Sequence, residues 1–150
     1  MIFCNARICC CRRQCCPLPC PEPQPPCPPV LSAYGTFRSA TPLTAGTGSL
    51  PLAVNVGNVE NVIFTSGNTF VTILIAGTYR IGYDVASGTG TGTISATVNG
   101  VIEVATTQSI PVTTSPISTL VQLVAGDRVG VTVSGTLTAN YVDLSLIKVS

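Results

Sequence analysis

All eight cysteines of this 150-residue chain lie before residue 30, together with eight of its twelve prolines. Residues from 30 onward are rich in Val, Thr, Ile, Gly and Ser and contain no cysteine. Because proline fixes φ and has no N–H group to donate, a proline-rich segment forms neither a helix nor a central strand. The sequence therefore predicts three parts: a cysteine-rich tail at 1–16, an extended proline-rich spacer at 17–29 and a folded domain at 30–150.

The folded part alternates apolar and polar residues with the period of two that is typical of β-strands. In one run every second side chain is apolar, namely Tyr79, Ile81, Tyr83 and Val85. Turn signals rich in Gly, Asn and Pro separate such runs. We expect an all-β fold, a two-sheet antiparallel jelly roll of about ten strands, preceded by the extended cysteine- and proline-rich arm. The expected strands lie at residues 31–38, 51–57, 60–66, 69–76, 78–86, 91–98, 101–107, 117–124, 128–134 and 140–149.

One turn raises a question of register. If Asn99-Gly100 forms a two-residue hairpin, Val98 pairs with Val101, and this pairing puts Glu103 on the core face. We therefore expect either a bulge that resets the register or a position for Glu103 at the edge of a sheet.

Two runs, at residues 70–75 and 120–124, are apolar on both faces of the expected strands. Either another subunit or the chain's own loops must cover the outer face, and large apolar patches usually mark subunit interfaces. For Tyr79 and Tyr83, filling the core is the favoured role. The candidate interface residues are Phe70, Val71, Ile73, Ile75, Tyr79, Tyr83, Val121 and Leu123.

The charge and the missing residue types exclude several functions. Seven basic and six acidic side chains give a formal net charge of +1, and the chain has no histidine. Near neutrality argues against a nucleic-acid-binding protein. The lack of histidine removes the commonest general base and most catalytic zinc sites. We assign no catalytic residue, metal site or cofactor and expect a protein that is not an enzyme.

The amino-terminal residues do not have the pattern of an export signal. Arg7, Arg12 and Arg13 interrupt the apolar residues there, so we expect no conventional secretory signal peptide. No apolar run approaches the roughly 18 residues that span a bilayer, so we expect no transmembrane segment. Disulfides nevertheless need an oxidising environment. Lysis of the producing cell, around a spore or virion, would expose the cysteines to an oxidising environment without the need for an export signal.

The cysteine spacing favours bonds between subunits. Adjacent cysteines rarely bridge each other, because their Cβ vectors point apart, so clustered cysteines favour different partners. The tail is therefore expected to act as a multivalent crosslinker. Alternatives are disulfides within one chain, a metal site on the C-x₃-C spacings, or acylation of the cysteine string beside arginines that face anionic lipid. The candidate crosslinking residues are Cys4, Cys9, Cys10, Cys11, Cys15, Cys16, Cys20 and Cys27.

Three motifs stand out in the folded part. They are Gly-Thr-Tyr-Arg-Ile-Gly-Tyr-Asp-Val at 77–85, Leu-Val-Ala-Gly-Asp-Arg-Val-Gly-Val at 123–131 and Leu-Ser-Leu-Ile-Lys-Val at 144–149. Together they resemble the carboxy-terminal domain of BclA-type exosporium glycoproteins, spore-surface members of the complement/tumour-necrosis-factor jelly-roll superfamily. The resemblance covers about residues 32–150 and implies a ten-strand jelly roll that forms compact trimers.

The amino-terminal part departs from that family. BclA-type proteins carry a collagen-like Gly-x-y stalk before the head, whereas the cysteine–proline arm takes its place here. In arrangement, the arm is similar to those of bacterial endospore appendage subunits, which bond covalently to neighbouring subunits.

These observations predict a structural protein of the spore surface, exosporium or an extracellular appendage. Its trimeric head would associate with itself and with other spore-surface proteins, and its cysteine arm would link subunits into a layer or fibre. The alternative is a trimeric recognition head that binds a receptor or glycan, with the arm as a tether.

Overall fold

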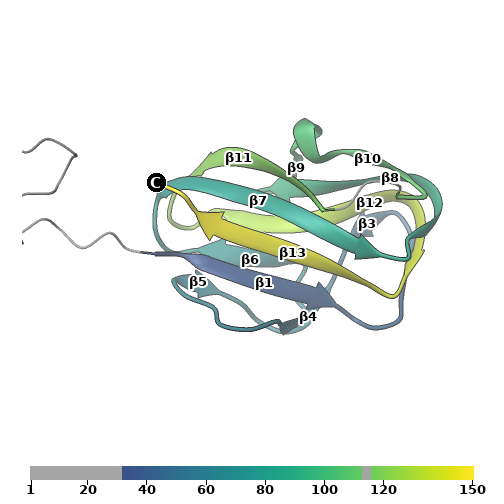
Figure 1. Cartoon of the computed structure of the whole chain (residues 1–150), viewed down its shortest axis with the longest axis horizontal. Helices are drawn as coiled ribbons and strands as arrows, with labels where there is room; N and C mark the ends of the chain where they lie inside the picture. The colour runs from purple at the N-terminus through teal and green to yellow at the C-terminus, as the bar shows by residue number, and fades with distance from the viewer. Residues whose placement is uncertain (1–31, 113–115) are drawn as a thin grey trace, which may run out of the picture. The chain divides into compact units, whose positions relative to one another are not determined.

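The alternating strands pair into two antiparallel sheets that face each other across one apolar core, and the fold is a jelly roll (Figure 1). The computed structural model describes residues 32–112 and 116–150. The eight cysteines, the tail at 1–16 and the spacer at 17–29 therefore lie outside the described residues. Within the described part of the chain, no helix is long and apolar enough to cross a membrane.

Sheet A has five strands in the order β11-β7-β13-β1-β4. In this order they span Ile117–Leu123, Gly77–Ala86, Tyr141–Lys148, Tyr34–Ser39 and Leu52–Asn55. Figure 1 shows β7, β13 and β1 side by side, with β12 and β6 of the other sheet behind them.

Sheet B has a main path in the order β10-β8-β12-β6-β5. These strands span Gln108–Ile110, Thr89–Val98, Arg128–Ala139, Phe70–Ile73 and Val62–Ile63. The two five-strand paths together have ten strands; nine of them overlap strands expected from the sequence, and β10 lies in none of the expected ranges. Three short additional strands belong to sheet B: β2 (Leu43–Ala45) and β3 (Gly48–Ser49) pair with β12, and β9 (Val101–Ile102) pairs with β8.

The period-two prediction is confirmed in the long strands. On β7 the side chains of Tyr79, Ile81, Tyr83 and Val85 are all buried. β13 buries every second residue from Val142 to Leu146, and β12 does the same from Val129 to Val133. These inward faces, together with those of β1, β6 and β8, form the continuous core between the sheets.

Tyr83 ties the two sheets together. Its ring is buried in the core, and its hydroxyl lies 2.6 Å from the carbonyl oxygen of Thr106 and 3.0 Å from that of Ile94. Both carbonyls belong to the opposite side of the sandwich, in sheet B and the short 3-10 turn beside it. Burial raises the pKa of Tyr83, so the phenol keeps its proton and acts as a donor.

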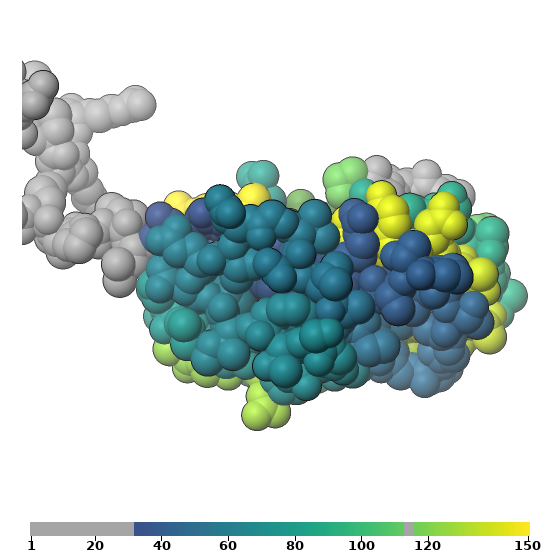
Figure 2. All heavy atoms as spheres, turned by 90° about the horizontal axis from the view of Figure 1, so that it is seen from below, coloured from purple at the N-terminus to yellow at the C-terminus, as the bar shows by residue number. Residues whose placement is uncertain are grey.

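The open edge of the sandwich is closed by the chain between β1 and β6. Leu52 donates its N–H to the Asn68 carbonyl at 2.8 Å, and Leu50 donates to Val131 at 2.8 Å. Tyr34 and Glu60 form an isolated antiparallel bridge at the same side of the molecule. Figure 2 shows this edge from below, covered by the blue and teal residues of the first half of the described chain.

The expected strand at 101–107 is wrong beyond Ile102. Asn99 and Gly100 have φ angles of +52° and +80°, as a two-residue hairpin turn requires, and Val98 pairs with Val101 as predicted. After Glu103, however, a 3-10 turn at Val104–Thr106 interrupts the strand. Glu103 stays half-buried at the edge of sheet B, which is one of the two outcomes expected for it. The inward position is filled instead by Thr106, whose hydroxyl accepts the Ala96 N–H at 2.9 Å.

Two neighbouring turns are joined by the Asp127 carboxylate. One oxygen accepts the Val124 N–H at 2.8 Å, and the other accepts the Asn99 amide at 2.9 Å. The Asn99 oxygen in turn accepts the N–H of Arg128 at 2.9 Å. These bonds to the charged form, first the one from Asn99 and then the one from Val124, lower the pKa of Asp127.

Replacing Tyr83 with Phe should destabilise the fold. Y83F removes the donor between the sheets and leaves a buried carbonyl without its partner, which costs about 1–3 kcal/mol. Denaturant unfolding should show a lower midpoint with an unchanged m-value. Y141F is the matched control, because the Tyr141 hydroxyl makes no hydrogen bond among the described residues. Equal stability of the two variants would contradict the bridging role.

Acid should weaken the Asp127 link. Because the pKa of Asp127 is lower in the folded protein than in the unfolded chain, its stabilising effect is complete above the unfolded-state value and disappears as pH falls through the folded-state value. The variant D127N lacks this titration. Unfolding free energies measured from pH 6 to pH 2 should therefore fall less steeply for D127N than for the parent. If the unfolding free energies of D127N and the parent fell in parallel with pH, the Asp127 carboxylate would not contribute to the acid sensitivity of the fold.

Candidate subunit interface

The outer face of sheet A carries a row of large side chains at one end. The register aligns Leu120 with Arg80, Arg80 with Ile147 and Ile147 with Tyr34, across four neighbouring strands. Leu120 is 60% exposed and Ile147 49% exposed. Three of the four members of this row are thus apolar or aromatic side chains that are partly exposed, Tyr34 the least of them at 36%.

The next row contains only small side chains. Ser118, Gly82 and Ser145 are aligned on β11, β7 and β13, and Thr36 continues the row on β1. A side chain at Gly82 would meet the carbonyl of Ile117, so the close approach of β11 to β7 requires glycine there. The middle of the face is consequently shallow, and another protein surface can approach its backbone closely.

The third row is charged and contains Arg38, Asp143 and Asp84, of which the first two form an ion pair. Arg38 donates two hydrogen bonds to the Asp143 carboxylate, at 2.8 and 2.7 Å. Its guanidinium also lies over the Tyr141 ring, 3.8 Å from the ring centre. The hydrogen bond to Asp143 is the main reason that the pKa of Arg38 is raised. Because Arg38 and Asp143 neutralise each other, a partner surface would have fewer charges to match.

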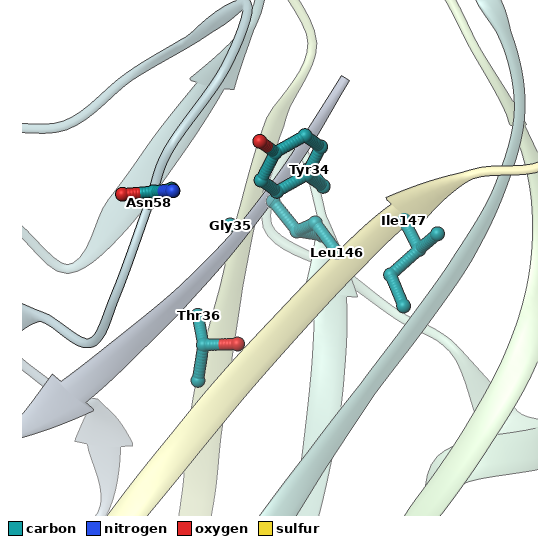
Figure 3. Close-up of a pocket in the computed structure, with 6 residues that line it drawn as sticks. All are labelled: Tyr34, Gly35, Thr36, Asn58, Leu146 and Ile147. Carbon is teal, nitrogen blue, oxygen red and sulfur yellow. The ribbon is translucent and has the colours of Figure 1, made fainter. Parts of the chain in front are cut away.

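A small apolar hollow lies beside the first row, between β1 and β13. Figure 3 shows Tyr34 and Thr36 on β1, Ile147 on β13 and Asn58 on the loop at its far side. The hollow has a volume of about 230 Å³. A projecting apolar side chain from another molecule would fit its lining.

The structure divides the predicted interface residues into two groups. Five of them are buried in the subunit's own core and are not available to a second subunit: Val71, Ile73, Tyr79, Tyr83 and Leu123. Val121 is half-buried and packs against the same core. Phe70 and Ile75 are half-buried, and Phe70 lies on the outer side of sheet B, under the guanidinium of Arg128. The jelly roll buries these strands through its own second sheet, which is why a partner is not needed there.

The exposed apolar residues on sheet A were not predicted. Leu120 lies in the run at 120–124 that is apolar on both faces, so that signal was present. Ile147 follows the buried Leu146 and must therefore point outward, which alternation alone could have shown. Nothing in the sequence marks Tyr34 as a surface residue.

The described residues contain no grouping of three or more His, Cys, Asp or Glu side chains that could hold a metal ion. The outer face of sheet A presents apolar side chains, small residues, the exposed Arg80, Asp84 and the Arg38–Asp143 ion pair.

Comparisons with known proteins find similarity in three-dimensional structure and none in sequence families. No protein-family model and no curated protein sequence matches the chain. Among solved structures, the chain is similar to the Eiger TNF of S. frugiperda, with 14% sequence identity and a TM-score of 0.49. The match covers 80% of this chain and 94% of that chain.

Proposed function

We propose that the protein is a structural, non-enzymatic component of a spore surface, in which jelly-roll heads form trimers and the cysteine arm links them into a layer or fibre. The observation that carries the proposal is the separation of all eight cysteines from the folded domain. A domain of about 120 residues has enough core to fold without disulfides. The thiols are therefore free to bond to other subunits.

The outer face of sheet A supports a ring-shaped assembly. Leu120 lies on the edge strand β11, whereas Tyr34, Ile147 and the apolar hollow lie on the strands further across the sheet. Two different apolar features on one face suit a head-to-tail contact, in which the edge of one copy meets the sheet of the next. Such contacts close into rings when the rotation permits. The resemblance to BclA-type domains favours three copies.

The arm adds covalent strength to an assembly that is already formed. Three arms in one trimer raise the local concentration of thiols, which favours disulfides between protomers and between neighbouring trimers. The low charge and the missing histidine are consistent with an inert building block.

A charge at Leu120 should separate the subunits. Burying a new carboxylate in an apolar contact is costly, so L120D should weaken assembly by at least about tenfold, or about 1.4 kcal/mol. Light scattering after size exclusion, with the full chain in thiol reductant, measures the non-covalent state. Val104 is 81% exposed on the 3-10 turn outside sheet A, so V104D is the control. A parent protein that is monomeric in reductant, or an L120D trimer, would contradict the proposal.

The cysteines should be needed for covalent assembly and not for the trimer. Non-reducing electrophoresis of air-oxidised full-length protein should show a ladder of multimers that collapses to monomer on reduction. Replacing all eight cysteines by serine should remove the ladder and leave the light-scattering trimer intact.

Two results would contradict this role. One is a single monomer band both before and after reductant. The other is a modification that adds mass to the cysteines and is removed by hydroxylamine, which would show that the cysteines are acylated instead.

A further inference from the structure

A polar hollow opens on the outer face of sheet B, on the sheet opposite the proposed subunit contact. It lies where β6 and β12 begin and β8 ends, beside the turns that Asn99 and Asp127 join. Its volume of about 530 Å³ falls within the range of about 300–1,000 Å³ typical of small-ligand sites. The lining residues are Ser49, Thr69, Phe70, Thr97, Asn99, Gly100, Gly126 and Arg128.

Beside the hollow, Gly130 interrupts the row of outward side chains. The register places Gly130 between Thr97 on β8 and Phe70 on β6. A side chain at Gly130 would meet the backbone carbonyl of Thr69, so glycine is required at that position. The Thr69 backbone therefore covers Gly130 between Thr97 and Phe70, and Thr69 is itself part of the lining.

Thr97 supplies an unused polar group inside this space. The residue is only 7% exposed, yet its hydroxyl makes no hydrogen bond among the described residues. Its oxygen lies 3.4 Å from the point that a Gly130 Cβ would occupy. No buried side-chain oxygen or nitrogen in the described part of the chain lacks a hydrogen-bond partner, so solvent reaches this hydroxyl. A ligand in the hollow would take the place of that solvent.

Arg128 supplies the charge. Its guanidinium lies over the Phe70 ring, 4.6 Å from the ring centre, an arrangement that holds the side chain in place by a cation–π contact. It forms no ion pair with any acid in residues 32–112 and 116–150. The carboxylate next to it in sequence, that of Asp127, is bound to Val124 and Asn99 instead. The donors of Arg128 thus remain available to an anion.

The lining matches one negative charge and several hydroxyl groups. No carboxylate lines the hollow, and Arg128 is its single cation. A guanidinium binds a carboxylate through two parallel hydrogen bonds. The hydroxyls of Ser49, Thr69 and Thr97 can each donate and accept, as sugar hydroxyls do. We propose that this hollow binds a carboxylate-bearing sugar of the uronic-acid class, with Arg128 on the carboxylate and Thr97 on a ring hydroxyl.

The test compares two sugars that differ only in the carboxylate. Methyl β-D-glucuronide and methyl β-D-glucoside are titrated into the full-length protein in reductant and followed by NMR. The glucuronide should shift the amide signals around Thr97 and Gly130 and bind at least tenfold more tightly than the glucoside. Acetate and inorganic sulfate serve as simple anions and should bind at least tenfold more weakly than the glucuronide.

Two substitutions in the hollow and one outside it complete the test. R128Q should weaken glucuronide binding by at least tenfold, and T97V by about threefold to tenfold. R80Q is the matched control, because Arg80 is an exposed arginine on sheet A, and it should change the affinity by less than twofold. Equal binding of the two sugars, acetate or sulfate as tight as the glucuronide, an R128Q variant with full affinity, or no binding would each overturn the proposal.

Discussion

The burial of every second side chain on the long central strands determines what all the other residues can do. β7 and β13 from sheet A face β8 and β12 from sheet B, and their inward residues form one continuous core. The hydroxyl of Tyr83 crosses from sheet A to the backbone of Ile94 and Thr106, so the sheets are joined by a directional bond as well as by apolar contact. With the inward faces committed to this core, any function of the domain must come from the two outward faces and the turns.

Those two outward faces differ in chemistry. Sheet A exposes Leu120, Ile147 and Tyr34 next to a row of small residues. Sheet B instead presents threonines and serines on its two central strands, where Thr91 and Thr136 lie with their hydroxyl oxygens 3.3 Å apart. Its exposed apolar side chains, Ile63, Val101 and Ile102, are confined to the short strands β5 and β9. Covering the apolar face with another copy removes hydrocarbon from water, whereas covering the hydroxyl face would cost the loss of well-solvated groups. A subunit contact through sheet A would therefore leave sheet B open to solvent and to ligands.

The sequence predicted the class of fold and most of the core, because alternation reports directly which side of a strand faces inward. The alternate apolar residues from Tyr79 to Val85, from Val129 to Val133 and from Val142 to Leu146 are buried as predicted. Five of the candidate interface residues lie in the core for a related reason. Val71, Ile73 and Leu123 lie in runs without alternation, and a strand that is apolar on both faces does not reveal which face the second sheet will cover. The polar hollow is lined by Phe70, Thr97 and Arg128 from three strands that are far apart in sequence, and no local pattern encodes such a meeting.

Two arginines of this domain lie over aromatic rings, and they show what distinguishes a structural arginine from one that can bind a ligand. Arg38 lies over Tyr141, and both of its hydrogen bonds go to Asp143, so its charge is neutralised within the fold. Arg128 lies over Phe70, but its acidic neighbour Asp127 is occupied by two other donors. The same aromatic support therefore leaves a paired cation on sheet A and a cation without an ion pair on sheet B. Since the second one borders a hollow that is also lined by Thr97, an external anion bound there would contact both the guanidinium and a hydroxyl.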